Sequence, residues 1–285
     1  MAGKKIDPFS HVVDSDHIEL FGGLEIHGLE YHGIPLKFML FIALCAVGVG
    51  GGMVWLAQKM KNGDPPRGKL WNLLEALLFF VRDKIAVPGV GEHDANKYLP
   101  YLTTLFLFIF AMNLLGMIPF MGSPTASLAV TGALALVSFF VIHISGIQQM
   151  GAVGYLKSFI PHIHIEGGPV MQLLGRAITV GIALLEYATA FIRATVLAVR
   201  LFANMLAGHT VLFMILMFIA MVANGSPYQI AFAAGKGWLY YLVTPFSVLL
   251  VTALSVLELF IAGLQAFIFT FLTAVFIGLA KHPAH

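Results

Sequence analysis

The residues best suited to do chemistry in this chain lie inside long apolar segments, where ionisable side chains are rare. The stretch RLFANMLAGH, residues 200–209, carries an arginine, an asparagine and a histidine. An arginine at membrane depth costs about 2.5–3.5 kcal/mol on insertion scales, and it usually faces a protein interior or an ion path. These residues therefore indicate a chain that moves ions.

The composition supports a membrane location for these segments. Of the 285 residues, 59% are hydrophobic and 11% are charged, whereas average soluble domains have about 25% charged residues. The net charge of +2 is too small to indicate nucleic-acid binding. The single cysteine, Cys45, argues against a disulfide framework and a CxxC metal pair. The first 35 residues lack an apolar core, so no cleavable signal peptide is expected.

The pattern of apolar segments predicts an all-α polytopic membrane protein of about five to six helices. Residues 1–34 are expected to be a polar tail, and 35–285 a single transmembrane domain. The apolar segment 70–87 also carries several charges, which suits a helix at the membrane surface. Three full spans, each close to the ~20 residues that a bilayer requires, are predicted at 35–57, 98–120 and 127–147.

Two long helices are predicted to form an antiparallel channel hairpin at about 169–281. Residues 170–226 contain no proline, and 228–282 contain only Pro245. A helix of ~54 residues would be roughly 80 Å long, whereas the bilayer core is ~30 Å thick. Each stretch is therefore either one long tilted helix or two shorter pieces. The lack of loop residues favours long tilted helices.

The distribution of lysine and arginine predicts the orientation of the chain. If the spans alternate, the basic loop 58–69 falls on the same side as Lys157 and Lys281. The turn at 224–237 contains one lysine and falls on the other side with the acidic tail. This places the N-terminus outside and the C-terminus in the cytoplasm.

The first of the two long helices carries a regular polar stripe. Glu186, Arg193 and Arg200 are seven residues apart, so they share one face with ~20° of drift per heptad. Asn204 lies four residues after Arg200, on the same face.

An antiparallel hairpin would bring this polar helix to specific positions on the last helix. In an antiparallel hairpin, residues at one depth are equally far along the sequence from the turn. The midpoint between Arg200 and Gln265 is about residue 233, inside the predicted turn, and the midpoint between His209 and Glu258 is the same. Each pair should therefore lie at one depth. The two levels are about 13 Å apart along the helix axis, and the His/Glu level lies nearer the outer turn.

The two levels predict different chemistry. A glutamate and a histidine side by side in a low dielectric can relay a proton near neutral pH. An arginine cannot lose its proton at any working pH, so Arg200 is expected to be a fixed positive barrier. Gln265 can hydrogen-bond this guanidinium without neutralising it. The layout describes half of a proton path that ends at a gate.

Other charged or polar residues in the spans allow two interpretations. Arg193 either belongs to the proton path or has only a structural role, in which it pairs with Glu186 or extends to the membrane interface. Asn113 either lines a path or only stabilises its span. Arg176 is a further candidate for the path.

The remaining histidines are not expected to bind metal. His162 and His164 lie in a predicted loop and are interpreted as a solvated face. His143 lies in a span as a simple hydrogen-bonding residue and is assigned no role. No cofactor and no metal are expected.

At these residues the chain resembles subunit a of the membrane sector of the F-type ATP synthase. The two long motifs, in this order and at this separation, are specific to that family. The similarity covers the C-terminal two-thirds of the chain. It is carried by RLFANMLAGH (200–209), LELFIAGLQAFIF (257–269), NLLGMIP (113–119) and Glu186.

The resemblance implies roles for individual residues. Arg200 would be the essential arginine that faces the carboxylate on each subunit c of the rotor ring. His209 and Glu258 would be the pair of the outer half-channel, in the order found in some bacterial members. The chain departs from the pattern at Gly116, where some members carry an acid. The other matches are Gln265 beside the arginine, Asn204 in the channel and Glu186 at the cytoplasmic half-channel.

The resemblance also implies a non-catalytic stator subunit. The sequence has no Walker motif, so no nucleotide site is expected. The lack of a cleavable presequence indicates a bacterial or organelle-encoded chain, and a bacterial inner membrane is expected. The partners of such a subunit would be the subunit c ring, the peripheral stalk subunit b, the rest of the complex and the lipid bilayer, with no nucleic acid. Two alternatives stay open. A stand-alone secondary transporter would have inverted repeats and broken helices, and a haem-binding cytochrome subunit would need paired axial histidines.

Overall fold

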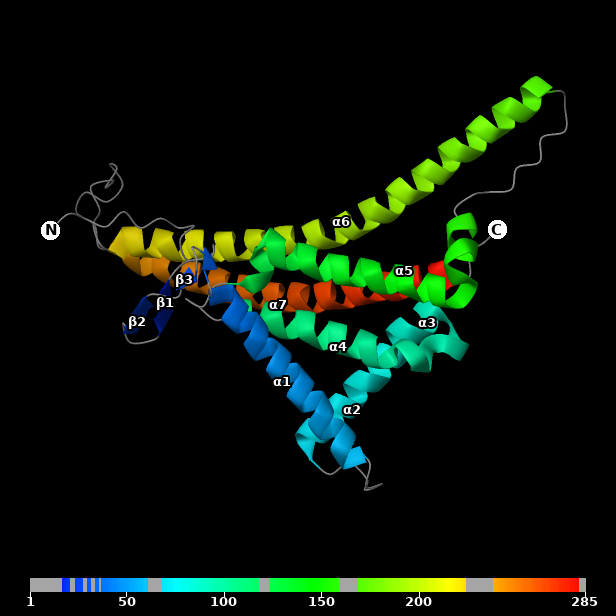
Figure 1. Cartoon of the computed structure of the whole chain (residues 1–285). Coiled ribbons are helices and arrows are strands. Elements are labelled where there is room, and N and C mark those ends of the chain that lie inside the picture. Colours follow the sequence, from blue (N-terminus) through cyan, green and yellow to red (C-terminus); the bar gives the residue numbers. More distant parts are fainter. Residues whose placement is uncertain are drawn as a thin grey trace. The chain divides into compact units, whose positions relative to one another are not determined.

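The computed structural model is predominantly helical (Figure 1). It describes residues 17–20, 24–27, 30–31, 34–35, 37–60, 68–117, 123–158, 169–223 and 238–281. The helical elements are α1 (Lys37–Met60), α2 (Lys69–Val81), the π-helix η1 (Arg82–Ala86), α3 (Val87–Val90), α4 (Glu92–Gly116), the 3-10 helix η2 (Pro124–Ala126), α5 (Leu128–Ser158), α6 (Pro169–Ala223) and α7 (Trp238–Lys281).

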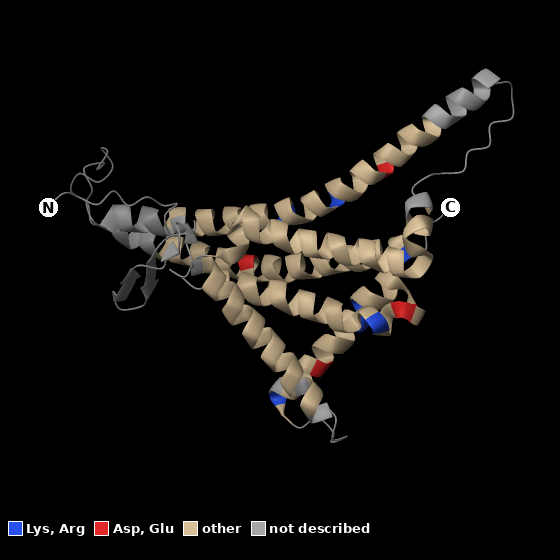
Figure 2. Cartoon of the chain, viewed as in Figure 1, with Lys and Arg blue, Asp and Glu red and all other residues tan. Residues whose placement is uncertain are grey.

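Five of the described helices are long and apolar enough to cross a membrane, which confirms the prediction of a polytopic helical membrane protein. Charged side chains are sparse along them (Figure 2). α4 begins earlier than its apolar run because Glu92 and Asp94 occupy its first turn, where negative charge favours the helix dipole. α2 is not among the five; the residues that follow it, Ile85 and Ala86, are fully buried.

The segment predicted as a polar tail contains two short antiparallel hairpins, which the sequence reasoning did not anticipate. In the first, β1 (His17–Leu20) pairs with β2 (Leu24–His27). In the second, β3 (Glu30–Tyr31) pairs with β4 (Ile34–Pro35). Polar and apolar residues alternate along β1 and β2, which is the pattern of a strand.

The two long helices are continuous, as the absence of loop residues predicted. α6 has 55 residues and α7 has 44, with Pro245 accommodated inside α7. α5 is different, because Gly151 adopts φ 74° and ψ 159° and divides it into two helical pieces. A positive φ is readily available only to glycine. Gly151 therefore ends the first helical piece of α5, which corresponds to the predicted span 127–147.

The chain forms two compact units, which both include parts of α6 and α7. The first unit comprises Met1–Met53, Leu107–Val130 and Leu201–Ala266. The second unit comprises Val54–Phe106, Thr131–Arg200 and Phe267–His285.

Within each unit, α6 and α7 contact one another in the predicted antiparallel register. In the first unit, Met205 of α6 packs with Ala262 of α7 in a buried cluster. In the second unit, the guanidinium of Arg193 lies 5.2 Å from the centre of the Phe276 ring. In both contacts the midpoint between the two residues in the sequence is close to residue 233, as the hairpin prediction requires.

Candidate functional site

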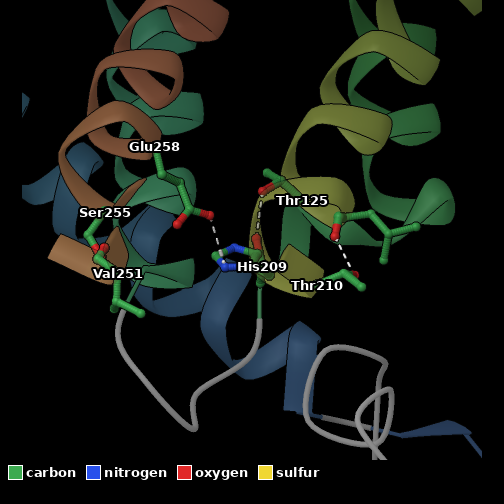
Figure 3. A network of polar contacts seen from close by, with 8 residues as sticks. Thr125, His209, Thr210, Val251, Ser255 and Glu258 are labelled. Carbon is green, nitrogen blue, oxygen red and sulfur yellow. Dashed lines mark hydrogen bonds and ion pairs between the residues drawn. The ribbon is translucent and has the colours of Figure 1, made fainter. Parts of the chain in front are cut away.

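The first unit brings His209 of α6 and Glu258 of α7 together. His209 Nδ1 lies 3.1 Å from Glu258 Oε1, and Figure 3 shows the two side chains pointing toward one another. Glu258 is only 5% exposed. The two helices thus place a carboxylate and an imidazole in direct contact, away from solvent.

This contact leaves several buried polar atoms without a hydrogen bond. Neither carboxylate oxygen of Glu258 has a hydrogen-bond partner among the described residues, and neither does His209 Nε2. The 3.1 Å approach is therefore an ion-pair distance without the alignment of a hydrogen bond. Such atoms are rare in folded proteins because an unmade buried hydrogen bond costs about 1–3 kcal/mol. A buried polar atom of this kind calls for an explanation, such as a catalytic role or an ordered water.

Gly208 makes the close approach of Glu258 to α6 possible. A β-carbon at this position would lie 2.8 Å from Glu258 Oε1. The carboxylate therefore occupies space that any other residue would fill. The sequence reasoning missed this role, although a glycine beside the key histidine was a signal, since glycine weakens a helix interior.

A cluster of buried polar residues from α4 and from the segment around η2 lies in the same unit as this histidine. Asn113 is fully buried and donates from Nδ2 to the carbonyl of Ala262, at 3.2 Å. The hydroxyls of Ser123 and Thr125 lie 2.9 Å apart and are also fully buried. Asn113 was a candidate from the sequence, whereas Ser123 and Thr125 were not.

Gly116 lies next to both Ser123 and His209. A β-carbon on Gly116 would lie 3.2 Å from His209 Nε2 and would overlap the Ser123 hydroxyl. The free ring nitrogen of His209 therefore faces the Gly116 backbone and the Ser123 hydroxyl. This is the position at which the sequence departs from the expected family pattern, and the polar group beside it here is the Ser123 hydroxyl.

The other two candidates in the first unit differ in exposure. Gln265 is 6% exposed, so its amide is inside the unit. Asn204 is exposed. The predicted pairing of Gln265 with Arg200 stays a prediction, since Arg200 is the last α6 residue of the second unit.

The second unit contains a cavity of about 410 Å³ between parts of α5, α6 and α7. Glu186 and Arg193 line it, together with mostly apolar side chains. Arg193 is exposed and its guanidinium also contacts the Phe276 ring. Two members of the predicted stripe therefore face one cavity, which is large enough for several water molecules.

Arg200 is half-buried, and it makes no ion pair among the described residues of the second unit. The Arg176 side chain and the loop histidines His162 and His164 lie outside the described residues. Within the described part of the chain, no three His, Cys, Asp or Glu residues are grouped so that they could hold a metal ion.

Known proteins match this chain over most of its length. The family model described as ATP synthase A chain matches residues 38–278. An ATP synthase subunit a from Myxococcus xanthus is 38% identical, over 82% of this chain and 72% of the relative. A subunit a from Chloroherpeton thalassium is 31% identical, over 99% of this chain and 79% of the relative. One from Anaeromyxobacter dehalogenans is 39% identical over 78% of this chain, which covers 51% of that relative.

Proposed function

The chain belongs to the ATP synthase A chain family, and from this we propose that it is the proton-translocating stator subunit of a rotary ATP synthase. It works against a ring of c subunits and is held by a peripheral stalk that includes subunit b. It binds no nucleotide itself. Proton flow through it drives rotation, with an energy of ~2.3 kcal/mol per charge per 100 mV of membrane potential.

The entry path runs past His209 and Glu258. The observation that carries this proposal is their buried contact, in which the carboxylate oxygens and the second imidazole nitrogen have no hydrogen-bond partner among the described residues. A proton that enters from the outer side is passed between these groups and then neutralises a carboxylate of the ring. Asn113, Asn204 and Gln265 supply polar contacts along this path.

The exit path runs through the cavity that Glu186 lines. A ring carboxylate that has rotated through the lipid releases its proton there and then passes Arg200 in its ionised form. The half-buried Arg200 supports this role, because it has no carboxylate partner among the described residues of its unit and an arginine at membrane depth needs an anion. Its fixed charge prevents a direct leak between the two paths.

We infer that the chain lies in the inner membrane of a bacterium, with its N-terminus outside and its C-terminus in the cytoplasm. The five candidate spans among the described residues are an odd number, which supports termini on opposite sides. The basic residues near α2 and at the end of α7 then lie in the cytoplasm. The continuous α6 counts against a stand-alone transporter, since transporter sites commonly use broken helices.

Replacing Arg200 tests this function most directly. In membranes that carry the assembled complex, we expect Arg200→Ala to abolish ATP-driven proton pumping and ATP synthesis and to increase passive proton leak. Arg82→Ala is the control, because it removes an arginine with a 42% exposed side chain that lies in neither proposed path, and it should pump near the wild-type rate. Pumping and synthesis near the wild-type rate in Arg200→Ala would show that the stator assignment is wrong.

A further inference from the structure

The break in α5 creates an aromatic enclosure around His143, a residue to which the sequence assigned no role. After Gly151 the chain turns, and Tyr155 packs against the earlier part of the same element. A β-carbon on Gly146 would overlap the Tyr155 ring, so two glycines permit this arrangement. The rings of Tyr155 and His143 meet edge to face with centroids 5.8 Å apart, and the Phe139 ring lies 3.9 Å from the imidazole.

The hydrogen bonding of His143 fixes which ring nitrogen can accept a proton. Nδ1 lies 2.8 Å from the backbone carbonyl of Phe139. A carbonyl oxygen can only accept, so Nδ1 carries the hydrogen and Nε2 holds the lone pair of the neutral ring. Nε2 is buried and has no hydrogen-bond partner among the described residues. The ring is thus held in one tautomer with its basic nitrogen available.

His143 lines the same 410 Å³ cavity as Glu186 and Arg193. We propose that His143 Nε2 is a proton acceptor in the exit path, placed between the ring carboxylate and the cytoplasm. This inference rests on the function proposed above. It assigns the exit path a second titratable group, contributed by α5 rather than by the long hairpin.

The proposed step moves one proton and no electrons. The O–H bond of a ring carboxyl breaks, and the proton binds the Nε2 lone pair, either directly or through water. The N–H bond at Nε2 then breaks and the proton passes to cytoplasmic water. Both states keep the bond from Nδ1 to Phe139.

The cavity that His143 lines carries two charged side chains, Glu186 and Arg193, both on α6. Tyr155 and two serines add neutral polar groups to the lining. The lining residues from α7, which are Phe276, Leu279 and Ala280, carry no titratable group. The lining therefore combines one acid, one base and His143, all facing one space that can hold water.

Chemical rescue tests this proposal. In vesicles stripped of the catalytic sector, passive proton conductance driven by a potassium potential is measured between pH 6 and 8, a window of about one pH unit on either side of neutrality. We expect His143→Phe and His143→Ala to reduce conductance roughly tenfold and to remove the imidazole step from the pH profile. Added imidazole should restore His143→Ala, whose truncated side chain leaves room, but not His143→Phe.

Two controls separate this role from packing. Ser145→Ala removes another α5 side chain that bonds the carbonyl four residues earlier but does not line the cavity, and it should retain the wild-type pH profile and show no response to imidazole beyond that of the wild type. Immunoblots of the membranes establish that each variant assembles. Wild-type conductance in both His143 variants, or a loss that imidazole does not restore and that leaves the pH profile unchanged, would overturn the proposal. If Arg200→Ala still abolishes pumping in that case, the proposed function stands without it.

Discussion

The contact between His209 and Glu258 and the cavity beside Glu186 place titratable groups in opposite ways. In the first, a carboxylate and an imidazole touch at 3.1 Å, and the carboxylate is almost fully buried. In the second, Glu186, His143 and Arg193 are distributed around about 410 Å³ of space. One region joins its groups by direct contact, and the other separates them.

This difference predicts two mechanisms of proton transfer. A direct contact passes a proton only if both side chains reach the correct place, so it should be sensitive to fractions of an ångström. A cavity that holds water tolerates displacement, because water molecules can bridge a changed gap. Glycine serves both regions, since Gly208 admits the Glu258 carboxylate and Gly146 admits the Tyr155 ring.

The largest effect is expected where the contact loses its ionisable group. Glu258→Gln keeps the size of the side chain but removes its proton chemistry, so we expect a fall in ATP-driven pumping of roughly a hundredfold. Pumping is followed by quenching of a pH-sensitive dye in inverted vesicles, with subunit content measured in the same membranes. A variant that pumps at more than half the wild-type rate would remove Glu258 from the path.

Shortening each carboxylate by one methylene compares the two regions directly. Glu258→Asp withdraws the carboxylate from His209 and should lower pumping about tenfold. Glu186→Asp withdraws a carboxylate that faces a cavity, and water should limit its loss to about twofold. Equal losses in the two aspartate variants, measured side by side, would contradict the distinction between contact and cavity.

A smaller loss is expected when the space for the Glu258 carboxylate is filled. The β-carbon of Gly208→Ala would lie 2.8 Å from Glu258 Oε1, so the flexible carboxylate must move while the helix is retained. We expect a reduction in pumping of about threefold to fivefold, since the contact is displaced and not removed. Gly181→Ala is the matched control on the same helix, because nothing lies within 4 Å of its β-carbon. If both alanine variants pump equally well, Gly208 has no part in positioning Glu258.

The long-range order of the fold was accessible from the sequence because it depends on simple periodicities. Apolar segment lengths predicted the spans, and the lack of prolines in 170–226 predicted a continuous α6. The common centre near residue 233 predicted that His209 and Glu258 would lie at the same depth, and the structure places them in contact. These inferences require only the regular rise and turn of a helix.

The parts that were missed depend on elements that meet only in three dimensions. Ser123 and Thr125 lie where the sequence has no periodic pattern, and they join the site only because Ser123 packs against Gly116 near His209. The role of Gly208 depends on a side chain fifty residues later in the chain. The enclosure of His143 depends on the single positive φ of Gly151, which changes the direction of α5.

The length of α6 has a consequence for how the protein reaches its membrane. Its candidate span, Ile178–Leu212, has 35 residues, which corresponds to about 52 Å of helix across a core of ~30 Å. To stay within that core it must tilt roughly 55°, whereas transmembrane helices tilt on average about 20°. A lone helix at that angle would present Glu186, Arg193 and Arg200 to lipid, so α6 is a poor substrate for insertion by itself. Biogenesis must therefore couple its membrane integration to the arrival of neighbouring helices, and copies without partners should be targets for membrane proteases.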